Sequence, residues 1–317
     1  MNYRFLYFIF IGLLLYHFSA GQLSWQMADA DFGTLPTGFH VYKTSDSLDG
    51  RPFLAYYAIA DLKNKKLFFS TDTTLQRRLS PGEFYQKNNY PLLVVNGSFF
   101  SFNTNQNLNL VIKKGKLLSY NIHNLAAKGK DTLTYRHPWN GAFGINKNRM
   151  ADVAWVFTDS SNRWAYASQE PVKPIHDSIA TIHLNQYKGL PVKKWKMKTA
   201  IAGGPVLLQN GQINISNDTE LKFSGIAKYD LHPRTVIGYT KDHKIIVLVV
   251  EGRHKNIADG ASLIQCAEIM KSLGCVEALN LDGGGSSCML INGKETIWPS
   301  DKGIQRKVPA VFLIETR

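Results

Sequence analysis

Short apolar segments rich in β-branched and aromatic residues follow one another along most of the chain, and turn residues separate them. This alternation is typical of β-strands joined by tight turns. Asn210-Gly211 and Asn292-Gly293 each predict a hairpin, because both residues tolerate a positive φ, and Lys114-Gly115 predicts a third. A chain of hairpins predicts a mixed, largely antiparallel β-sheet. The expected strands are 53–60, 66–71, 92–95, 110–112, 206–208, 213–215, 245–250 and 276–281.

One segment, 262–273, departs from the strand pattern and predicts an α-helix. Ser262 and Gln265 have the spacing of a capping box at its start. The helix follows the continuous apolar run 245–250 and precedes the strand 276–281, so the three form a βαβ-like unit. The chain therefore predicts an α+β fold, with a mixed, largely antiparallel sheet and a few helices. An α/β fold with additional strands is the alternative.

Residues 158–198 fit neither pattern, since they combine three prolines with many polar residues. They predict a long insertion or an irregular flap. No linker and no shift in composition divides the chain after residue 21. We therefore expect residues 22–317 to form a single domain.

The first 21 residues predict an export signal. Arg4 precedes an apolar run with the length of a signal-peptide hydrophobic region, which is short for a membrane span. Ser19 and Gly21 are small residues at the −3 and −1 positions of a cleavage site. We expect residues 1–21 to be removed, and the remaining protein to be exported to the periplasm, the cell surface or the medium. An uncleaved N-terminal anchor is the alternative, and no later apolar run is long enough to span a membrane.

The overall composition is that of a globular protein, with 44% hydrophobic and 19% charged residues. The net charge of +13 predicts attraction to polyanions. Nucleic acid, phosphate-bearing glycan and anionic surfaces all qualify, but no recognisable nucleic-acid-binding module is present. The nine histidines lack HExxH or HxE spacing and the three cysteines lack CxxC spacing, so a zinc site is poorly supported.

Two short polar segments border expected strands. Asn96, Gly97 and Ser98 follow the strand 92–95, and strand ends followed by glycine-containing loops are common places for sites. Gly204, in a Gly-Gly-Pro segment, lies just before another strand and allows close backbone approach. Taken alone, the first segment is better explained by a structural turn, and the second is weak evidence for a site.

Two arginines flank a further hairpin-like region. Arg234 begins one strand, and Glu251 and Arg253 follow the strand that comes after it. Antiparallel pairing would bring the start of the first strand beside the end of the second. We therefore expect two guanidinium groups and a carboxylate to cluster at one end of the sheet. Two arginines suit a phosphate or a carboxylate ligand, and a structural Arg–Glu network is the alternative.

The last polar segment follows the strand 276–281. Three successive glycines reduce the stability of a scaffold and become useful where the backbone approaches a ligand. Their N–H groups can form an anion-binding nest, and an acidic residue precedes them at the end of the strand. The absence of GK[ST] excludes a Walker loop. The segment consists of Asp282, Gly283, Gly284, Gly285, Ser286 and Ser287.

In this order, the segments resemble those of the phosphodiester glycosidase family. The matching stretches are NGSFF at 96–100, GGP at 203–205, HPRTVIG at 232–238, EGR at 251–253, the helix 262–273, LNLDGGGSS at 279–287 and VPAVFLI at 308–314. The motif-bearing part is about 90–317. The chain departs from the family pattern at Glu251, where an aspartate is frequent.

The resemblance implies hydrolysis of a sugar-1-phosphodiester at the anomeric carbon, which releases free sugar and leaves a phosphomonoester. Such a reaction passes through an oxocarbenium-like state that requires carboxylates, here Asp282 and Glu251. Arg234 and Arg253 would stabilise the phosphate, in a cleft at the strand ends. The substrate-positioning residues implied are Asn96, Gly97, Ser98, Gly204, Gly283, Gly284, Gly285, Ser286 and Ser287.

The sequence requires no cofactor, and a divalent cation with oxygen ligands such as Asp282 stays open. The expected partner is a phosphate-bearing glycan or glycoconjugate, and no nucleic acid is expected. Two other functions remain open. One is a non-catalytic exported module that binds glycan or envelope polysaccharide. The other is a metal-dependent phosphodiesterase that cuts the other P–O bond.

Overall fold

Tight turns organise the strands as the sequence predicts. The computed structural model describes residues 23–127, 131 and 133–316, and the predicted signal peptide, 1–21, lies outside these residues. Each of the three predicted turns joins two antiparallel strands, and both residues of each turn have a positive φ. The predicted hairpins are therefore confirmed.

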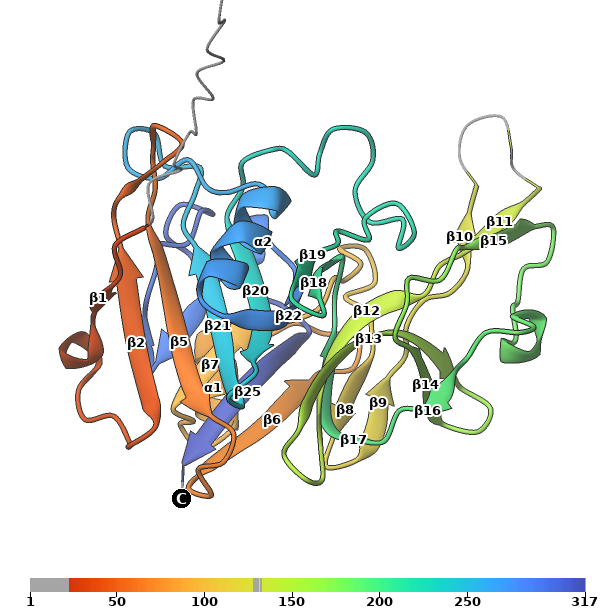
Figure 1. Ribbon diagram of the computed structural model, residues 1–317, viewed down its shortest axis with the longest axis horizontal. Helices are drawn as coiled ribbons and strands as arrows, with labels where there is room; N and C mark the ends of the chain where they lie inside the picture. The colour runs from red at the N-terminus through yellow and green to blue at the C-terminus, as the bar shows by residue number, and fades with distance from the viewer. Residues whose placement is uncertain (1–22, 128–130, 132, 317) are drawn as a thin grey trace, which may run out of the picture.

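The structure contains mostly antiparallel sheets and two α-helices within the described residues (Figure 1). The largest sheet has, in spatial order, β1 (Gln26–Met27), β2 (Phe39–Thr44), β5 (Ala55–Asp61), β21 (Lys244–Val250), β20 (Arg234–Thr240), β22 (Cys275–Asn280), β18 (Val206–Gln209) and β19 (Gln212–Ile213). A second sheet has β16 (Lys193–Lys194), β14 (Trp164–Ser168), β13 (Ala151–Asp159), β12 (Asn140–Asn146), β17 (Met197–Ala202), β8 (Val111–Lys113) and β9 (Lys116–Ser119).

A third sheet and smaller elements complete the structure. The third sheet has β24 (Lys294–Glu295), β23 (Met289–Ile291), β7 (Leu93–Asn96), β25 (Ala310–Thr316) and β6 (Leu67–Thr73). The helices are α1 (Pro81–Lys87) and α2 (Leu263–Ser272), with 3-10 turns at Asp29–Phe32, Leu184–Gln186 and Gly284–Ser286. The small sheets are β3 (Ser47–Leu48) with β4 (Arg51–Pro52), and β10 (Leu125–Ala126), β11 (Tyr135–His137) and β15 (Ile175–Asp177).

The main apolar core lies where the three large sheets meet. Its buried side chains include Phe39 of β2, Trp155 of β13, Ile201 of β17, Val247 of β21 and Phe312 of β25. A second apolar cluster lies between α2 and one face of the largest sheet. The end of the largest sheet that carries the motif segments is therefore supported from both faces.

Helix α2 begins at the predicted capping box. Ser262 Oγ accepts a hydrogen bond from Gln265 N at 3.1 Å, and Gln265 Oε1 accepts one from Ser262 N at 2.9 Å. The predicted βαβ-like unit is different in one respect, because β20 lies between β21 and β22 and pairs antiparallel with both. Every strand pair in the described residues is antiparallel, so the expectation of a mixed sheet is corrected.

The prediction of a long insertion or irregular flap for 158–198 is wrong in part. Strand β14 pairs with β13, and β16 extends the same sheet beyond β14. Ala165, Ala167 and Trp195 are buried in an apolar cluster on this sheet. The segment is thus ordered by packing against strands that precede it, which its own pattern of prolines and polar residues does not reveal.

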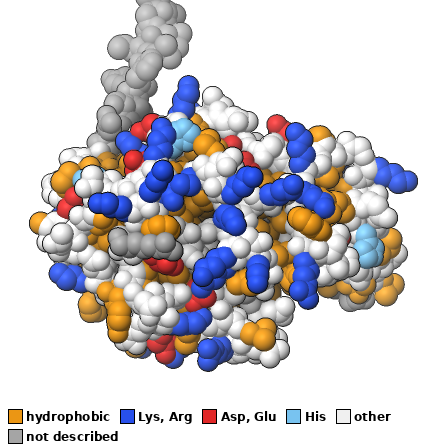
Figure 2. Space-filling model, turned by 90° about the horizontal axis from the view of Figure 1, so that it is seen from below, with side chains coloured by type: hydrophobic (Ala, Val, Ile, Leu, Met, Phe, Trp, Pro, Cys, Tyr) orange, Lys and Arg blue, Asp and Glu red, His pale blue; other side chains and the backbone are white. Residues whose placement is uncertain are grey.

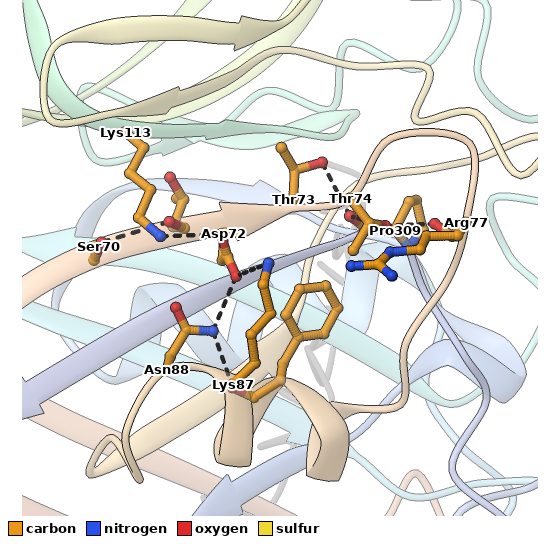
Figure 3. Close-up of polar contacts among 11 residues, drawn as sticks. Ser70, Asp72, Thr73, Thr74, Arg77, Lys87, Asn88, Lys113 and Pro309 are labelled. Atoms are coloured by element: carbon orange, nitrogen blue, oxygen red, sulfur yellow. Dashed lines mark hydrogen bonds and ion pairs between the residues drawn. The ribbon is translucent and has the colours of Figure 1, made fainter.

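Asp72 of β6 joins three elements through one buried carboxylate (Figure 3). It accepts hydrogen bonds from Lys87 Nζ at 2.6 Å, Asn88 Nδ2 at 3.0 Å and Lys113 Nζ at 2.9 Å. Burial alone would raise the pKa of Asp72, but these three donors outweigh it and hold the pKa below its ordinary value. The charged form of Asp72 therefore ties the end of α1 and strand β8 to β6.

We expect Asp72→Asn to lower the free energy of unfolding by about 1–3 kcal/mol, because it leaves two lysines without their anion. The contribution of Asp72 should be present above about pH 4, its unfolded pKa, and should be lost as the pH falls through the lower folded value. Urea unfolding at several pH values measures it. Asp31→Asn is the control, because its ion pair with Lys43 is exposed. An equal effect of both substitutions would contradict the role of Asp72.

Candidate active site

Hydrogen bonds hold the ends of β7, β20 and β22 together. Asp282 N donates to Gly97 O at 2.9 Å, and the buried Asn96 donates from Nδ2 to Asp282 O at 2.7 Å. Leu281 N donates to Thr235 O at 2.8 Å, and Thr235 Oγ1 donates to Asn96 Oδ1 at 2.8 Å. Three of the predicted motif segments thus meet around the backbone of Asp282.

Arg234 lies at the same end of the sheet. It is opposite Val250 of β21, as the predicted hairpin requires. The Arg234 guanidinium is buried and donates from Nε to Ala261 O at 2.9 Å and from Nη2 to Asp230 O at 2.8 Å. Both acceptors are neutral carbonyls, and a guanidinium has five N–H groups, so charge and donors remain for a ligand.

A pocket of about 230 Å³ opens beside these residues. It combines one carboxylate with three guanidinium groups, a glycine-rich wall and two aromatic rings. Its lining residues are Phe99, Phe223, Ala227, His232, Arg234, Arg253, Asp282, Gly283, Gly284, Gly285 and Arg306. The predicted residues Asp282, Arg234 and Arg253 are therefore brought together.

The carboxylate of Asp282 titrates at an unusual pH. Burial raises the pKa of Asp282 to about 6, although the Ser286 hydroxyl, the Arg306 charge and the N–H of Gly283 lower it in part. The Gly283 N–H donates to Asp282 Oδ1 at 3.0 Å. A perturbed carboxyl in a pocket is typical of a group that attacks, stabilises charge or moves a proton.

The positive groups of the pocket differ in their partners. Arg306 forms a two-point ion pair with Asp301, with distances of 2.8 and 3.1 Å. Arg253 is exposed, and its Nη2 lies 3.4 Å from His232 Nδ1. Burial, together with the nearby charges of Arg234 and Arg253, lowers the pKa of His232 and so favours its neutral form. The pocket consequently has an excess of positive charge and suits an anion such as a phosphate.

Gly284 and Gly285 make room for two arginine side chains. Gly284 has a φ of +60°, and a Cβ there would lie 3.0 Å from Arg253 Nη2. A Cβ on Gly285 would lie 2.1 Å from Arg306 Nη2. Any other residue at Gly285 would displace the Arg306 side chain, which explains one of the three glycines.

The predicted anion-binding nest receives little support from the backbone N–H groups. The N–H of Gly283 donates to the Asp282 carboxylate, and the N–H of Gly284 donates to Pro233 O at 2.8 Å. Both are therefore occupied within the protein. The guanidinium groups are the charged donors that this pocket offers to an anion.

Glu251 does not line this pocket. Its Oε1 lies 2.9 Å from His254 Nδ1, and its Oε2 accepts a hydrogen bond from Trp298 N at 2.8 Å. The side chain is buried, and both of its oxygens have partners. The structure therefore does not bring Glu251 and Asp282 together as a pair of carboxylates facing one pocket.

Like Glu251, six other predicted site residues do not line the pocket. Asn96 holds the Asp282 backbone, and Ser287 Oγ donates a hydrogen bond to Thr235 Oγ1 at 3.2 Å. A Cβ on Gly97 would lie 2.2 Å from Ile201 Cδ1, so this glycine permits close packing. Asn96 and Ser287 therefore support the pocket from outside its lining. The six predicted residues that do not line it are Asn96, Gly97, Ser98, Gly204, Ser286 and Ser287.

Sequence reasoning missed Phe223 and Arg306. Each lies in a segment without helix or strand, where periodicity gives no signal. Phe223 stacks beside Arg234, whose guanidinium carbon lies 5.7 Å from its ring centroid. An excess of basic residues was visible in the sequence, but only the folded chain shows which arginines line the pocket with Asp282.

The donor set of the pocket does not fit a divalent cation. Asp282 is its one carboxylate, and three guanidinium groups surround it. Divalent cations bind several oxygen ligands and avoid such positive surroundings. Among the described residues, no group of three or more His, Cys, Asp or Glu side chains is arranged to hold a metal ion. Cys266, Cys275 and Cys288 are buried free thiols.

Comparison with known proteins identifies the family of this chain. N-acetylglucosamine-1-phosphodiester alpha-N-acetylglucosaminidase of Mus musculus is 24% identical over 214 residues, which are 65% of this chain and 33% of that protein. The Homo sapiens protein of the same name is 28% identical over 109 residues, 32% of this chain and 21% of that protein. The matched region thus spans a third or less of these relatives.

Two solved structures share the fold. The zebrafish N-acetylglucosamine-1-phosphodiester alpha-N-acetylglucosaminidase catalytic domain, auto-inhibited by its pro-peptide, has a TM-score of 0.58 at 20% identity, covering 93% of this chain and 88% of that one. A hypothetical protein from Synechocystis has a TM-score of 0.64 at 15% identity, covering 93% and 68%. None of the helices in the described residues is long and apolar enough to cross a membrane. The phosphodiester glycosidase family model matches residues 89–315, and the chain therefore belongs to this family.

Proposed function

We propose that the protein hydrolyses a sugar-1-phosphodiester at the anomeric carbon, releasing free sugar and leaving a phosphomonoester. The observation that carries the proposal is the pocket in which Asp282 stands among Arg234, Arg253 and Arg306. Membership of the family supports the same reaction class. The relatives' names add N-acetylglucosamine as the first sugar to test.

The charges in the pocket suit the two halves of this reaction. A phosphate monoester leaves with its negative charge stabilised by arginines, so it needs little help from a general acid. The carboxylate of Asp282 balances the positive charge that develops on the sugar ring. One carboxylate therefore suffices in the pocket. Glu251 acts from outside it, by holding His254 and the backbone of Trp298 in place.

The stereochemistry of the product defines the role of Asp282. If its carboxylate attacks the anomeric carbon, the released sugar keeps the configuration of the substrate. If it activates water, the configuration is inverted. Proton NMR of the first sugar formed distinguishes the two roles.

Product analysis tests the reaction itself. A panel of sugar-1-phosphodiesters, including the N-acetylglucosamine derivative, is incubated with the purified protein. Free reducing sugar supports the proposal, and sugar-1-phosphate would support a phosphodiesterase instead. Binding without any product would support a glycan-binding module.

We expect kcat/KM to rise with pH and to level off above about pH 6, where Asp282 is ionised in the free protein. The value of kcat/KM rises with pH because the reaction requires the carboxylate form of Asp282. A pH profile measured with a substrate that does not titrate between pH 4 and 8 tests it. If kcat/KM does not change through pH 6, the ionisation of Asp282 does not control the reaction.

We also propose that the protein is exported and meets a phosphate-bearing glycan outside the cytoplasm. The N-terminal sequence pattern and the net charge of +13 support this. On the face seen in Figure 2, Lys and Arg side chains are widely spread and acidic side chains are sparse. The intact mass of the protein recovered from a secreting host should correspond to a start near Gln22, and retention of Met1 would contradict cleavage.

A further inference from the structure

A second pocket, of about 310 Å³, adjoins the one that contains Asp282. Phe99 and Phe223 line both pockets and contact each other edge to face, with ring centroids 6.1 Å apart. The remaining wall is largely apolar and includes leucine, isoleucine and proline side chains. Four polar side chains interrupt it, namely Asn109, Asn140, Glu220 and Lys222.

Lys222 brings an ammonium group to this apolar wall. Its Nζ donates to Asn140 Oδ1 at 2.6 Å and lies 5.1 Å from the centroid of the Phe99 ring. The carboxylate of Glu220 lines the same pocket, and its charge acts on Lys222. Burial lowers the pKa of Lys222 to about 8, although the charge of Glu220 opposes this. An ammonium group has three donors, so two remain beyond Asn140.

Glu220 lies in the segment that carries Lys222 and accepts four hydrogen bonds. Its carboxylate accepts hydrogen bonds from Gly141 N and Val206 N, both at 2.8 Å. Trp155 Nε1 and the hydroxyl of a neighbouring serine donate to the same carboxylate, at 3.2 and 2.5 Å. Glu220 therefore anchors the segment that carries Lys222.

Gly204 of the Gly-Gly-Pro motif provides the space for this arrangement. Its φ is +120°, and a Cβ there would lie 2.2 Å from Glu220 Oε2 and 2.5 Å from Lys222 Cε. The motif that sequence reasoning assigned to substrate contact thus makes room for the side chains of Glu220 and Lys222. The second pocket depends on a glycine that the first pocket does not use.

Asn109 carries a polar atom that has no partner among the described residues. The side chain is 2% exposed, and its Oδ1 accepts no hydrogen bond from them. Its orientation is set by Asn140, whose Nδ2 donates to Ile122 O at 3.3 Å and whose Oδ1 faces Asn109 Nδ2 at 3.4 Å. A buried acceptor without a donor destabilises a fold unless a ligand or a water satisfies it.

We infer that the second pocket is the subsite for the sugar ring that the reaction releases, with Lys222 and Asn109 as its specificity-determining residues. A pyranose has an apolar face that suits Phe99 and a polar edge that both accepts and donates hydrogen bonds. Lys222 donates to a ring substituent, and Asn109 Oδ1 accepts from another. This inference rests on the proposed function, which places the phosphate among the arginines of the first pocket.

Variants of the two polar residues test the subsite. Lys222→Met keeps the length of the side chain and removes the donor, and Asn109→Leu removes the unpartnered oxygen. We expect each to raise KM for an N-acetylglucosamine-1-phosphodiester by about 10- to 100-fold, with a smaller change in kcat. Asn109→Leu should leave the melting temperature unchanged or raised. Lys188→Met, at an exposed lysine outside the pocket, is the matched control.

A binding measurement separates this inference from the proposed function. Free N-acetylglucosamine, glucose, galactose and mannose are titrated into the wild type and each variant by saturation-transfer NMR, which needs no turnover. Loss of sugar binding in both variants supports the subsite even if no phosphodiester is hydrolysed. Hydrolysis with KM and sugar binding unchanged in both variants would overturn the subsite and leave the proposed function standing. Inorganic phosphate is titrated into the same proteins. Loss of phosphate binding with sugar binding unchanged would also overturn the subsite.

Discussion

Asp282→Asn is expected to lower kcat on a sugar-1-phosphodiester by about 10³-fold or more, because a catalytic carboxylate supplies several kcal/mol of transition-state stabilisation. The amide keeps the size of the side chain and cannot carry the charge. Asp282 is the one carboxylate among the pocket residues, so no neighbour in that lining replaces it. Steady-state kinetics on the purified variant measures the loss.

The stability of the same variant is the control for misfolding. Burial raises the pKa of Asp282 to about 6, so ionisation of this group opposes folding as the pH rises from about 4 to 6. Asp282→Asn removes that opposition, and its melting temperature at pH 7 should equal or exceed that of the wild type. A stable variant with near wild-type kcat would exclude Asp282 from the chemistry.

Local features of the fold were predictable because they depend on neighbouring residues. Asn210-Gly211 sets its hairpin through the φ preferences of two residues, and Ser262 sets the start of α2 through one cap. The assembly of strands into three sheets was not predictable. Strands β5 and β6 are joined by a short turn, yet they lie in different sheets. Their partners come from the distant β21 and β25, whose pairing no local pattern encodes.

The short helix α1 was missed for a related reason. Its seven residues, Pro81–Lys87, are too few to show a helical period, although Ser80 and Glu83 form a capping box. The capping pair was visible in the sequence and would have indicated a helix start. The sequence thus showed a helix N-cap but no periodic row of apolar residues after it.

Some residues of the candidate site could likewise be predicted from the sequence, and others could not. Asp282 and Arg234 were identified because both lie at the ends of recognisable strands, where register places them together. Arg306 and Lys222 lie in irregular segments and reach the pockets only through tertiary contacts. Glu251 was chosen for its charge and position near the strand end, but its oxygens are bound by His254 and Trp298. Spacing gives the end of a strand and not the direction of a side chain.

Arg253→Ala is expected to lower kcat/KM for a sugar-1-phosphodiester by about 10²-fold or more, because it removes a guanidinium that stabilises the leaving phosphate. Of the three arginines, Arg253 is the one whose replacement should disturb the fewest structural contacts. Its side chain is exposed and its recorded polar contact is His232, whereas Arg234 binds two backbone carbonyls and Arg306 binds Asp301. Arg253→Lys should retain part of the activity, since an ammonium offers a point charge and not a two-point donor.

The comparison of two leaving groups decides between a catalytic and a structural role for Arg253. An aryl glycoside of the same sugar departs without a phosphate, so Arg253→Ala should affect it much less than the phosphodiester. The double variant with Arg234→Ala should lose less than the sum of the two single effects, because both groups act on one anion. A structural role predicts equal losses on both substrates together with a lower melting temperature. Equal losses that follow the melting temperature would therefore mean that Arg253 supports the end of the sheet and not the phosphate.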